Sequence, residues 1–579
     1  MSAGNTGRWL GALCFAALST GCAKDTNETD EVAAAFADIV LTSARVFTVD
    51  SERPWAESVA LRADRIVAIG DNENTAALVG PDTRLIDANG RLVLPGFVDS
   101  HTHIFAGSFS AQRINLSLAD TLPKLRESLL AIKDQNPGDE AIYARGWQNH
   151  IFPKEGPRKE LLDEIFGERV VVLGSVDGHS TWFSSKAFEL AGVDASTGDS
   201  EPGVSFFERD PATGELLGTA REAASGLVTS KVISFEREAY KEALQRWLPE
   251  AAAAGLTTVF DAGATAPTTE EAYRILEELE ASGELTLRVF GSVGYEFGDD
   301  EPSARLLALR ERYSGEYFRP HSVKLYADGV PEGHTAFLLD PYVDQPGSFG
   351  EPMITPERMT ELIVASFEND VPVHVHAIGG GAIRMTLDAI EAARESTGKQ
   401  DVAAAIAHMD FVSAEDIPRF AKLNVVAQTS IQWAAADPSY ANIGSFVGMQ
   451  KVEAAYPVRS LIDAGALQTF GADWPAAAYL STYKPLTLLE VAVTRQLPGE
   501  LEMPVRNRDE RLSVEEAIRS LTIRSARQLG QEDVIGSLEP GKKADLIMLE
   551  ENVLDIEAHR IHNAGVALTI MDGRIVHEY

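Results

Sequence analysis

Two histidines separated by one residue follow an apolar, strand-like run near residue 100. The stretch VLPGFVDSHTH (93–103) turns through Pro95 and Gly96 and ends on His101 and His103. Alternate residues of a β-strand share one face, so both imidazoles project to the same side. Imidazole is a common ligand of Zn²⁺. Two exposed loop histidines are the commoner explanation of such a pair taken alone, so partners elsewhere in the chain must decide between a metal site and a loop.

Further side chains that bind metals stand in or just after other apolar, strand-like runs. They are Lys324 in VKLYADG (323–329), His376 in VHVHAIG (373–379), His408 in AIAHMDF (405–411) and Asp473 in QTFGADW (468–474). Imidazole and carboxylate donors with an open position suit Zn²⁺, which lowers the pKa of a bound water toward about 7. The sequence therefore predicts a hydrolytic site with one or two divalent cations, in which Asp473 is the general base. A helix N-cap is the alternative role of Asp473.

The elements that must position these residues alternate between strand-like runs and helical stretches, which predicts a parallel α/β architecture. Eight strands are the number that closes a (β/α)8 TIM barrel, and such barrels carry their reacting groups at the C-terminal strand ends. The candidate strands are 97–103, 257–263, 287–293, 323–329, 373–379, 405–411, 425–430 and 468–474. We expect the polar groups above to meet at one barrel mouth.

Three segments flank or interrupt this alternation. Residues from about 109 to 248 break the strand–helix rhythm, and we interpret them as a large insertion after the first barrel strand, placed to roof the mouth. Short β-like pieces in 37–95 and 531–579 predict a small composite β-sandwich, with Asp572-Gly573 as a hairpin turn. The barrel itself is assigned to 96–530.

Composition and the first residues indicate where the protein works. The chain has 51 Lys and Arg and 87 Asp and Glu, which gives a net charge of −36. This charge argues against binding to nucleic acid or to an anionic membrane surface. Both cysteines, Cys14 and Cys22, lie near the N-terminus, so the body has no disulfide and no nucleophilic cysteine. Residues 1–22 resemble a secretory leader, LSTGC resembles a lipoprotein box, and 23–36 reads as a polar tether.

We therefore expect an exported bacterial protein, located in the periplasm or held at the outer membrane only through a lipid on Cys22. An ordinary signal peptide and an uncleaved anchor are the alternatives for the leader. A homodimer stays open.

Seven motifs in order resemble the metal-dependent amidohydrolase superfamily, and most closely its YtcJ-like branch. The resemblance runs from about Ala37 to the C-terminus. The motifs are LPGFVDSHTH, GHSTWFSSKAFELAGV, AGLTTVFDAG, VKLYADG, HAIG, FGADWP and GSLEPGKKADLIML. The resemblance implies that CO2 carbamylates Lys324, which then bridges two metal ions. Otherwise Lys324 snorkels or pairs with Asp328. His374 shares a face with His376, and we assign it a deeper role as a core residue or a support for the ligands.

The resemblance implies a hydrolase that cleaves a C–N bond of a small amide, N-acyl compound or cyclic amide. Metal-bound hydroxide would attack, with Asp473 as the base. An esterase or lactonase uses the same chemistry, and a non-catalytic binding or regulatory lipoprotein is the alternative of a different class. His179 in DGHSTW is expected to contact the substrate carbonyl or its oxyanion, or to be structural.

Trp147, and Arg221 with Glu222 in GTAREAA, are further candidates for the substrate pocket. Packing is the alternative role of Trp147, and a solvated helix start is the alternative for the other two.

Overall fold

The computed structural model describes residues 36–111, 114–153, 155–200, 203–233, 236–263, 268–296, 301–437, 440–476 and 482–579. The predicted leader, and the predicted tether up to residue 35, lie outside these ranges. No helix within them is long and apolar enough to cross a membrane.

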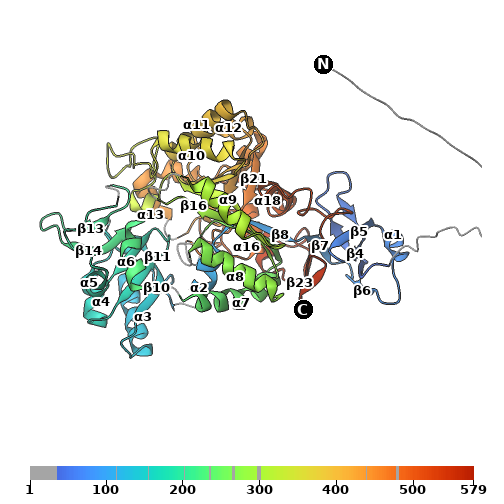
Figure 1. The fold of residues 1–579 in the computed structure, drawn as a ribbon, viewed down its shortest axis with the longest axis horizontal. Helices are drawn as coiled ribbons and strands as arrows, with labels where there is room; N and C mark the ends of the chain where they lie inside the picture. Colours follow the sequence, from blue (N-terminus) through green and yellow to red (C-terminus); the bar gives the residue numbers. More distant parts are fainter. Residues whose placement is uncertain are drawn as a thin grey trace, which may run out of the picture.

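A parallel eight-stranded barrel lies at the centre of the described chain (Figure 1). Each strand pairs with its sequence neighbour in the barrel, which confirms the predicted (β/α)8 fold. The strands are β8 (Phe97–Thr102), β15 (Leu256–Asp261), β16 (Arg288–Gly294), β17 (Phe318–Tyr326), β18 (Val373–Ala377), β19 (Ala404–His408), β20 (Val425–Thr429) and β21 (Leu467–Phe470). All residues of β18, β19 and β20 are buried, because one face fills the barrel and the other packs under helices.

The barrel closes where the last strand meets the first. Asp473 N donates to His101 O at 2.7 Å, and His103 N donates to Trp474 O at 2.8 Å. A Cβ at Gly471 would lie 2.6 Å from the His101 backbone nitrogen, so only glycine admits this approach. Closure therefore brings His101 and Asp473 together although they lie at opposite ends of the barrel sequence.

Several strands end before the predicted boundaries. β21 stops at Phe470, so Asp473 lies in the loop that follows it, and His103 lies just after β8. These residues use their backbone groups to join the two ends of the barrel instead of extending a strand. Side chains on such short loops at strand ends are held by the rigid barrel below them.

Helices form the outer layer of the barrel. They are α7 (Arg237–Ala253), α8 (Thr269–Ala281), α9 (Pro302–Arg312), α10 (Pro356–Glu368), α11 (Gly380–Thr397), α12 (Ile417–Lys422), α15 (Val458–Asp463), α16 (Pro485–Thr494), α17 (Val514–Ser520) and α18 (Ile523–Gln528). α13 (Tyr440–Val447) and α14 (Met449–Glu453) lie between β20 and α15. Local sequence starts several of them: α10 begins with Pro356 after Thr355, whose side chain accepts a hydrogen bond from Arg358 N.

The segment after β8 forms a second sheet on one side of the barrel (Figure 1). Its strands are β9 (Ile114–Asn115), β10 (Ile142–Trp147), β11 (Val171–Ser175), β12 (Ser180–Phe183), β13 (Phe207–Arg209) and β14 (Leu216–Arg221). Its helices are α3 (Leu122–Gln135), α4 (Lys159–Phe166), α5 (Ser185–Ala191) and α6 (Ala224–Val232), and α2 (Ile104–Ser110) precedes it. We call β9–β14 with α3–α6 the insertion. α7, at the end of the segment that the sequence assigns to the insertion, packs against α2 and β15.

The two ends of the chain form a β-sandwich on the opposite side of the barrel (Figure 1). One sheet contains β1 (Ile39–Thr42), β4 (Ser58–Arg62), β5 (Arg65–Gly70) and β6 (Arg84–Asp87), near α1 (Asn72–Ala76). The other mixes both ends: β2 (Arg45–Phe47), β3 (Trp55–Ala56), β7 (Leu92–Pro95), β22 (Leu546–Leu549), β23 (Val566–Met571) and β24 (Arg574–Glu578). Apolar residues of both sheets share one core. Asp572 and Gly573 have positive φ and form the predicted hairpin turn.

A buried ion-pair network joins the barrel to the sandwich. Arg288 of β16 donates to Asp545 and, at 2.7 Å, to Asp572. Lys543 Nζ lies 2.7 Å from carboxylate oxygens of both Asp572 and Asp64. The network therefore ties β16 to both terminal parts of the sandwich.

Replacement of Arg288 by methionine should strongly destabilise the protein, because it leaves Asp545 and Asp572 buried without their guanidinium partner. We expect Arg288→Met to lower the free energy of unfolding by about 3 to 5 kcal/mol in urea denaturation at neutral pH. Arg312→Met is the matched control, since its partner Glu270 is on the surface, and it should cost less than about 1 kcal/mol. Equal losses in the two variants would contradict the role of this network.

Candidate metal centre

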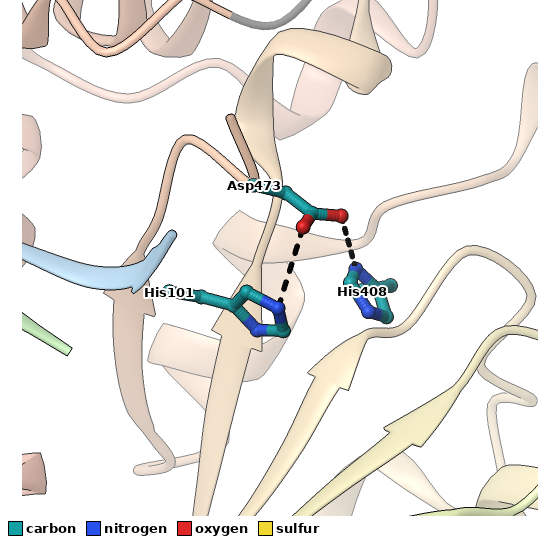
Figure 2. A group of neighbouring side chains, drawn as sticks. All are labelled: His101, His408 and Asp473. Atoms are coloured by element: carbon teal, nitrogen blue, oxygen red, sulfur yellow. Dashed lines mark ion pairs between the residues drawn. The ribbon is translucent and has the colours of Figure 1, made fainter. Parts of the chain in front are cut away.

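Three side chains converge at the mouth, two from the first and sixth barrel strands and one from the loop after the last strand (Figure 2). One ligand atom from each of His101, His408 and Asp473 lies within 4.8 Å of the others, and all three residues are buried. Asp473 Oδ1 is 3.4 Å from His101 Nε2, and Asp473 Oδ2 is 3.5 Å from His408 Nδ1. The carboxylate thus lies between the two imidazoles.

Three other predicted ligands surround this group. His103 Nε2 lies 3.2 Å from Asp473 Oδ1, and Lys324 Nζ lies 3.4 Å from His101 Nε2. The ring centroid of His376 is 4.5 Å from that of His408. The structure therefore brings together all six residues that the sequence analysis proposes as ligands.

Each of the four imidazoles has one nitrogen engaged by a group outside the cluster. The contacts are His101 Nδ1 to His374 Nε2 (2.9 Å), His103 Nδ1 to Gly263 O (2.6 Å), His376 Nε2 to Gly329 O (3.3 Å) and His408 Nδ1 to Ser430 Oγ (3.0 Å). Such contacts fix the orientation of a ring and leave its second nitrogen for a metal. Trp433 also stacks on His408, with centroids 5.2 Å apart.

His374 and Asp328 occupy supporting positions. His374 pairs with Lys324 in the strand register, and its ring contacts His101 one layer below the mouth. Asp328 accepts hydrogen bonds from the backbone nitrogens of residues 337, 378 and 379. The hydrogen-bonding neighbour of Lys324 is therefore His101. The Asp328 carboxylate instead binds backbone N–H groups in the loops after β17 and β18.

The backbone at two of these residues is in an uncommon conformation. His408 has φ 74° and Asp473 has φ 50°, the left-handed region that non-glycine residues rarely adopt. Such conformations cost about 1 to 3 kcal/mol each and persist where the surrounding structure determines them. Both residues lie at the point where a barrel strand turns into its loop, and their conformation directs the side chains to the mouth.

Burial and charge set the protonation of the cluster. Burial lowers the pKa of His101 well below its usual value, and the nearby Lys324 charge lowers it further. Burial also lowers the pKa of Lys324 to about 7. For Asp473, burial raises the pKa, but the neighbouring His408 and His103 outweigh it and hold the pKa at about 2.

Burial also lowers the pKa of His376 and of His408. At His103 burial lowers the pKa, but the hydrogen bond and charge of Asp473 outweigh it and raise the pKa. The cluster thus combines an ionised carboxylate with three imidazoles that favour the neutral form, which is the form that binds a metal.

These residues fit a divalent cation. Asp473 Oδ1 is buried without a hydrogen-bond partner in the described part of the chain. Buried polar atoms are normally paired, so an oxygen of this kind beside imidazole nitrogens is suited to bind a divalent cation. His101, His103, His376, His408, Lys324 and Asp473 are the residues that would hold one or two such ions.

His179 comes to the mouth from the insertion. Its ring centroid is 5.5 Å from that of His376, and its Nδ1 lies 2.8 Å from Glu222 Oε2. Burial lowers the pKa of His179, but the Glu222 charge outweighs this effect and raises the pKa to about 9. A cationic imidazole beside the metal cluster can donate a hydrogen bond to a carbonyl oxygen.

Two other pocket candidates are engaged elsewhere. Trp147 is fully buried in the insertion core, where its Nε1 donates to Leu173 O at 2.9 Å. Arg221 donates to Glu208 and Ser180, whereas its neighbour Glu222 contacts His179. The positive φ of Glu222 turns the chain just after β14, so Glu222 reaches the mouth while Arg221 stays among insertion residues. The sequence analysis did not single out Ser430 or Trp433. Only their position, at the end of the predicted strand 425–430 and just after it, could have indicated them.

Replacing His374 should weaken metal binding without removing a ligand. We expect His374→Phe to raise the dissociation constant for zinc about 10- to 100-fold, measured by competition with a chelator, because His101 loses the partner that orients it. His321→Phe is the matched control, since His321 is a partly buried histidine of β17 that packs against Phe260 and Phe290. Wild-type affinity in His374→Phe would exclude the supporting role.

Comparison with known proteins places this arrangement in a family. Protein LONG AFTER FAR-RED 3 of Arabidopsis thaliana is 29% identical over 559 residues, covering 93% of this chain and 91% of its own. YtcJ of Bacillus subtilis is 27% identical, covering 92% and 98%. The N-substituted formamide deformylase of Arthrobacter pascens is 26% identical, covering 93% and 98%.

A solved structure of a metal-dependent hydrolase from Pyrococcus furiosus shares the fold, with a TM-score of 0.66 at 24% identity over 89% of this chain and 100% of that one. The model of the family described as "Amidohydrolase family" matches residues 84–577. This chain therefore belongs to the amidohydrolase family.

Proposed function

We propose that this protein is a metal-dependent hydrolase that cleaves a C–N bond in a small amide, N-acyl compound or cyclic amide. The observation that carries the proposal is the buried Asp473 carboxylate, whose Oδ1 has no hydrogen-bond partner in the described residues and lies among the nitrogens of His101 and His103. This arrangement suits a cation and a water held beside a base.

A bound Zn²⁺ or similar ion would polarise the substrate carbonyl and lower the pKa of a coordinated water. Asp473 accepts a proton from the attacking water and delivers it to the leaving nitrogen as the C–N bond breaks. His179 donates a hydrogen bond to the carbonyl oxygen, on which negative charge develops. The products are a carboxylate and an amine, so the atoms of one water molecule are consumed.

Support for an amide substrate comes from the deformylase relative, which is similar to this chain over nearly its whole length. Esters and lactones present the same carbonyl to the same groups, so an esterase or lactonase is the second candidate. Substrates of both kinds therefore belong in one assay.

We also propose that Lys324 carries a CO2-derived carbamate, whose oxygens would help to hold two divalent cations. Lys324 is fully buried and its Nζ lies 3.4 Å from His101 Nε2. A protonated Lys324 would repel a metal ion, whereas a carbamate on Lys324 supplies two oxygens that share a negative charge. The neutral amine attacks CO2, and the amine proton leaves to solvent as the N–C bond forms.

Metal removal should abolish hydrolysis. Purified wild type, assayed on matched N-formyl amines, N-acetyl amines, esters and lactones, should lose turnover with a chelator and regain it with zinc. His101→Ala should lose both bound metal and more than about 100-fold of kcat/KM, since a ligand matters more than its supporting partner. His559→Ala, on an exposed surface, is the control.

Three outcomes of this assay would count against the proposal. Turnover confined to esters and lactones would identify the second candidate. Turnover that survives complete metal removal would exclude a metal-dependent mechanism. Tight ligand binding without turnover, unchanged by metal removal, would identify a binding protein.

Lys324→Ala should be inactive and partly rescued by a short carboxylate such as propionate, which can occupy the position of the carbamate. A ¹³C NMR signal from protein equilibrated with ¹³C-bicarbonate should appear in wild type and be absent from Lys324→Ala. Full activity in Lys324→Ala, or the absence of a carbamate signal from an active wild type, would exclude this modification.

A further inference from the structure

Glu222 links the insertion to the barrel mouth through its two carboxylate oxygens. Oε2 lies 2.8 Å from His179 Nδ1, and Oε1 accepts a hydrogen bond from Thr335 Oγ1 at 2.9 Å. His179 belongs to the insertion, whereas Thr335 lies in the loop after β17, the barrel strand that carries Lys324. The Glu222 side chain is only 6% exposed, so the carboxylate is held between the two units.

The loop that contains Thr335 also holds a predicted metal ligand. Gly329 N donates to Thr335 O at 2.9 Å, and Gly329 O lies 3.3 Å from His376 Nε2. A Cβ at Gly329 would overlap both Thr335 Oγ1 and Glu222 Oε1, so only glycine fits here. Because the His179 ring lies against the His376 ring, contacts lead from His179 through Glu222, Thr335 and Gly329 back to the metal centre.

Glu222 engages His179 through its backbone as well. Its N–H donates to His179 O at 2.9 Å, and its φ of 49° lies in the left-handed region, which is unusual for a residue with a side chain. Strained backbone of this kind clusters at functional sites, where the surrounding contacts maintain it. His179 N donates to Asp177 Oδ1 at 2.9 Å, so the backbone of the histidine is held from both sides.

We propose that Glu222 is a positioning residue that acts through His179 and fixes its imidazole over the metal centre with Nε2 left for the substrate. This inference rests on the proposed function. The four imidazoles of the metal centre follow the same pattern, with one nitrogen held by an outer partner and the other kept for chemistry. Since Nδ1 is the atom bonded to Glu222, Nε2 is the ring nitrogen that remains for a substrate oxygen.

A double-mutant cycle tests whether Glu222 acts through His179. Glu222→Gln and His179→Gln should each lower kcat/KM on an N-formyl amine about 10- to 100-fold, mainly through kcat. The double variant should be no worse than the poorer single variant, because the second change removes a support whose target is already lost. Asp163→Asn is the control, since Asp163 is an insertion carboxylate that bonds Ser185. Losses that multiply in the double variant would overturn the proposal.

A second measurement does not depend on turnover. An imidazole N–H held by a carboxylate gives a far-downfield ¹H NMR resonance. His334 and His562 also contact carboxylates, so we expect one resonance of this kind that is present in wild type and Asp163→Asn and lost in both His179→Gln and Glu222→Gln. Zinc content should be equal in wild type and Glu222→Gln, and selective zinc loss in Glu222→Gln would show that it acts on the metal site instead.

The two proposals fail in different ways. A wild type that hydrolyses no substrate would end the proposed function, while the resonance would still decide the contact between Glu222 and His179. If Glu222→Gln does not fold, His179→Gln alone assigns the resonance. A wild-type spectrum without any resonance that His179→Gln removes would overturn the inference.

Discussion

The metal centre depends on the closure of the barrel between its last and first strands. His101 and Asp473 become neighbours only because the loop after β21 hydrogen-bonds to β8. One buried carboxylate organises this seam: Asp99 Oδ1 accepts from His101 N at 3.0 Å and from Ala472 N at 3.1 Å. Gly471 permits the close approach. Backbone contacts that close the fold therefore also set the distance between His101 and Asp473.

The same seam concentrates charge where water is excluded. A buried carboxylate is costly unless charged or hydrogen-bonding groups surround it, and Asp473 has His103, His408 and Lys324 around it. The insertion adds His179 with Glu222 at the mouth, and the sandwich is tied to the far side of the barrel through Arg288. The barrel thus carries the metal centre, the insertion adds side chains at its mouth, and the sandwich is held to the barrel by buried ion pairs.

Much of the fold could be predicted because its determinants are local. Apolar runs alternating with helical segments indicated all eight barrel strands, and the two-residue period of a strand placed His374 below His376. Strand ends were less predictable, as the case of Asp473 shows, because the pairing of distant backbone groups decides where a ladder stops. Trp147 and Arg221 are pocket candidates by sequence, but core packing and ion pairing engage them within the insertion.

By itself, the sequence determined which donors are present and in what order the barrel strands carry them, since residue type and strand periodicity are properties of short segments. Only the tertiary structure decided which nitrogen of each imidazole is engaged, because the partners include the backbone carbonyls of Gly263 and Gly329. Every residue has a backbone carbonyl, so residue type does not indicate which carbonyl a ring nitrogen will meet. The tertiary structure likewise placed Glu222 and not Arg221 at the mouth, because the orientation of the insertion relative to the barrel is set by contacts between segments far apart in the chain.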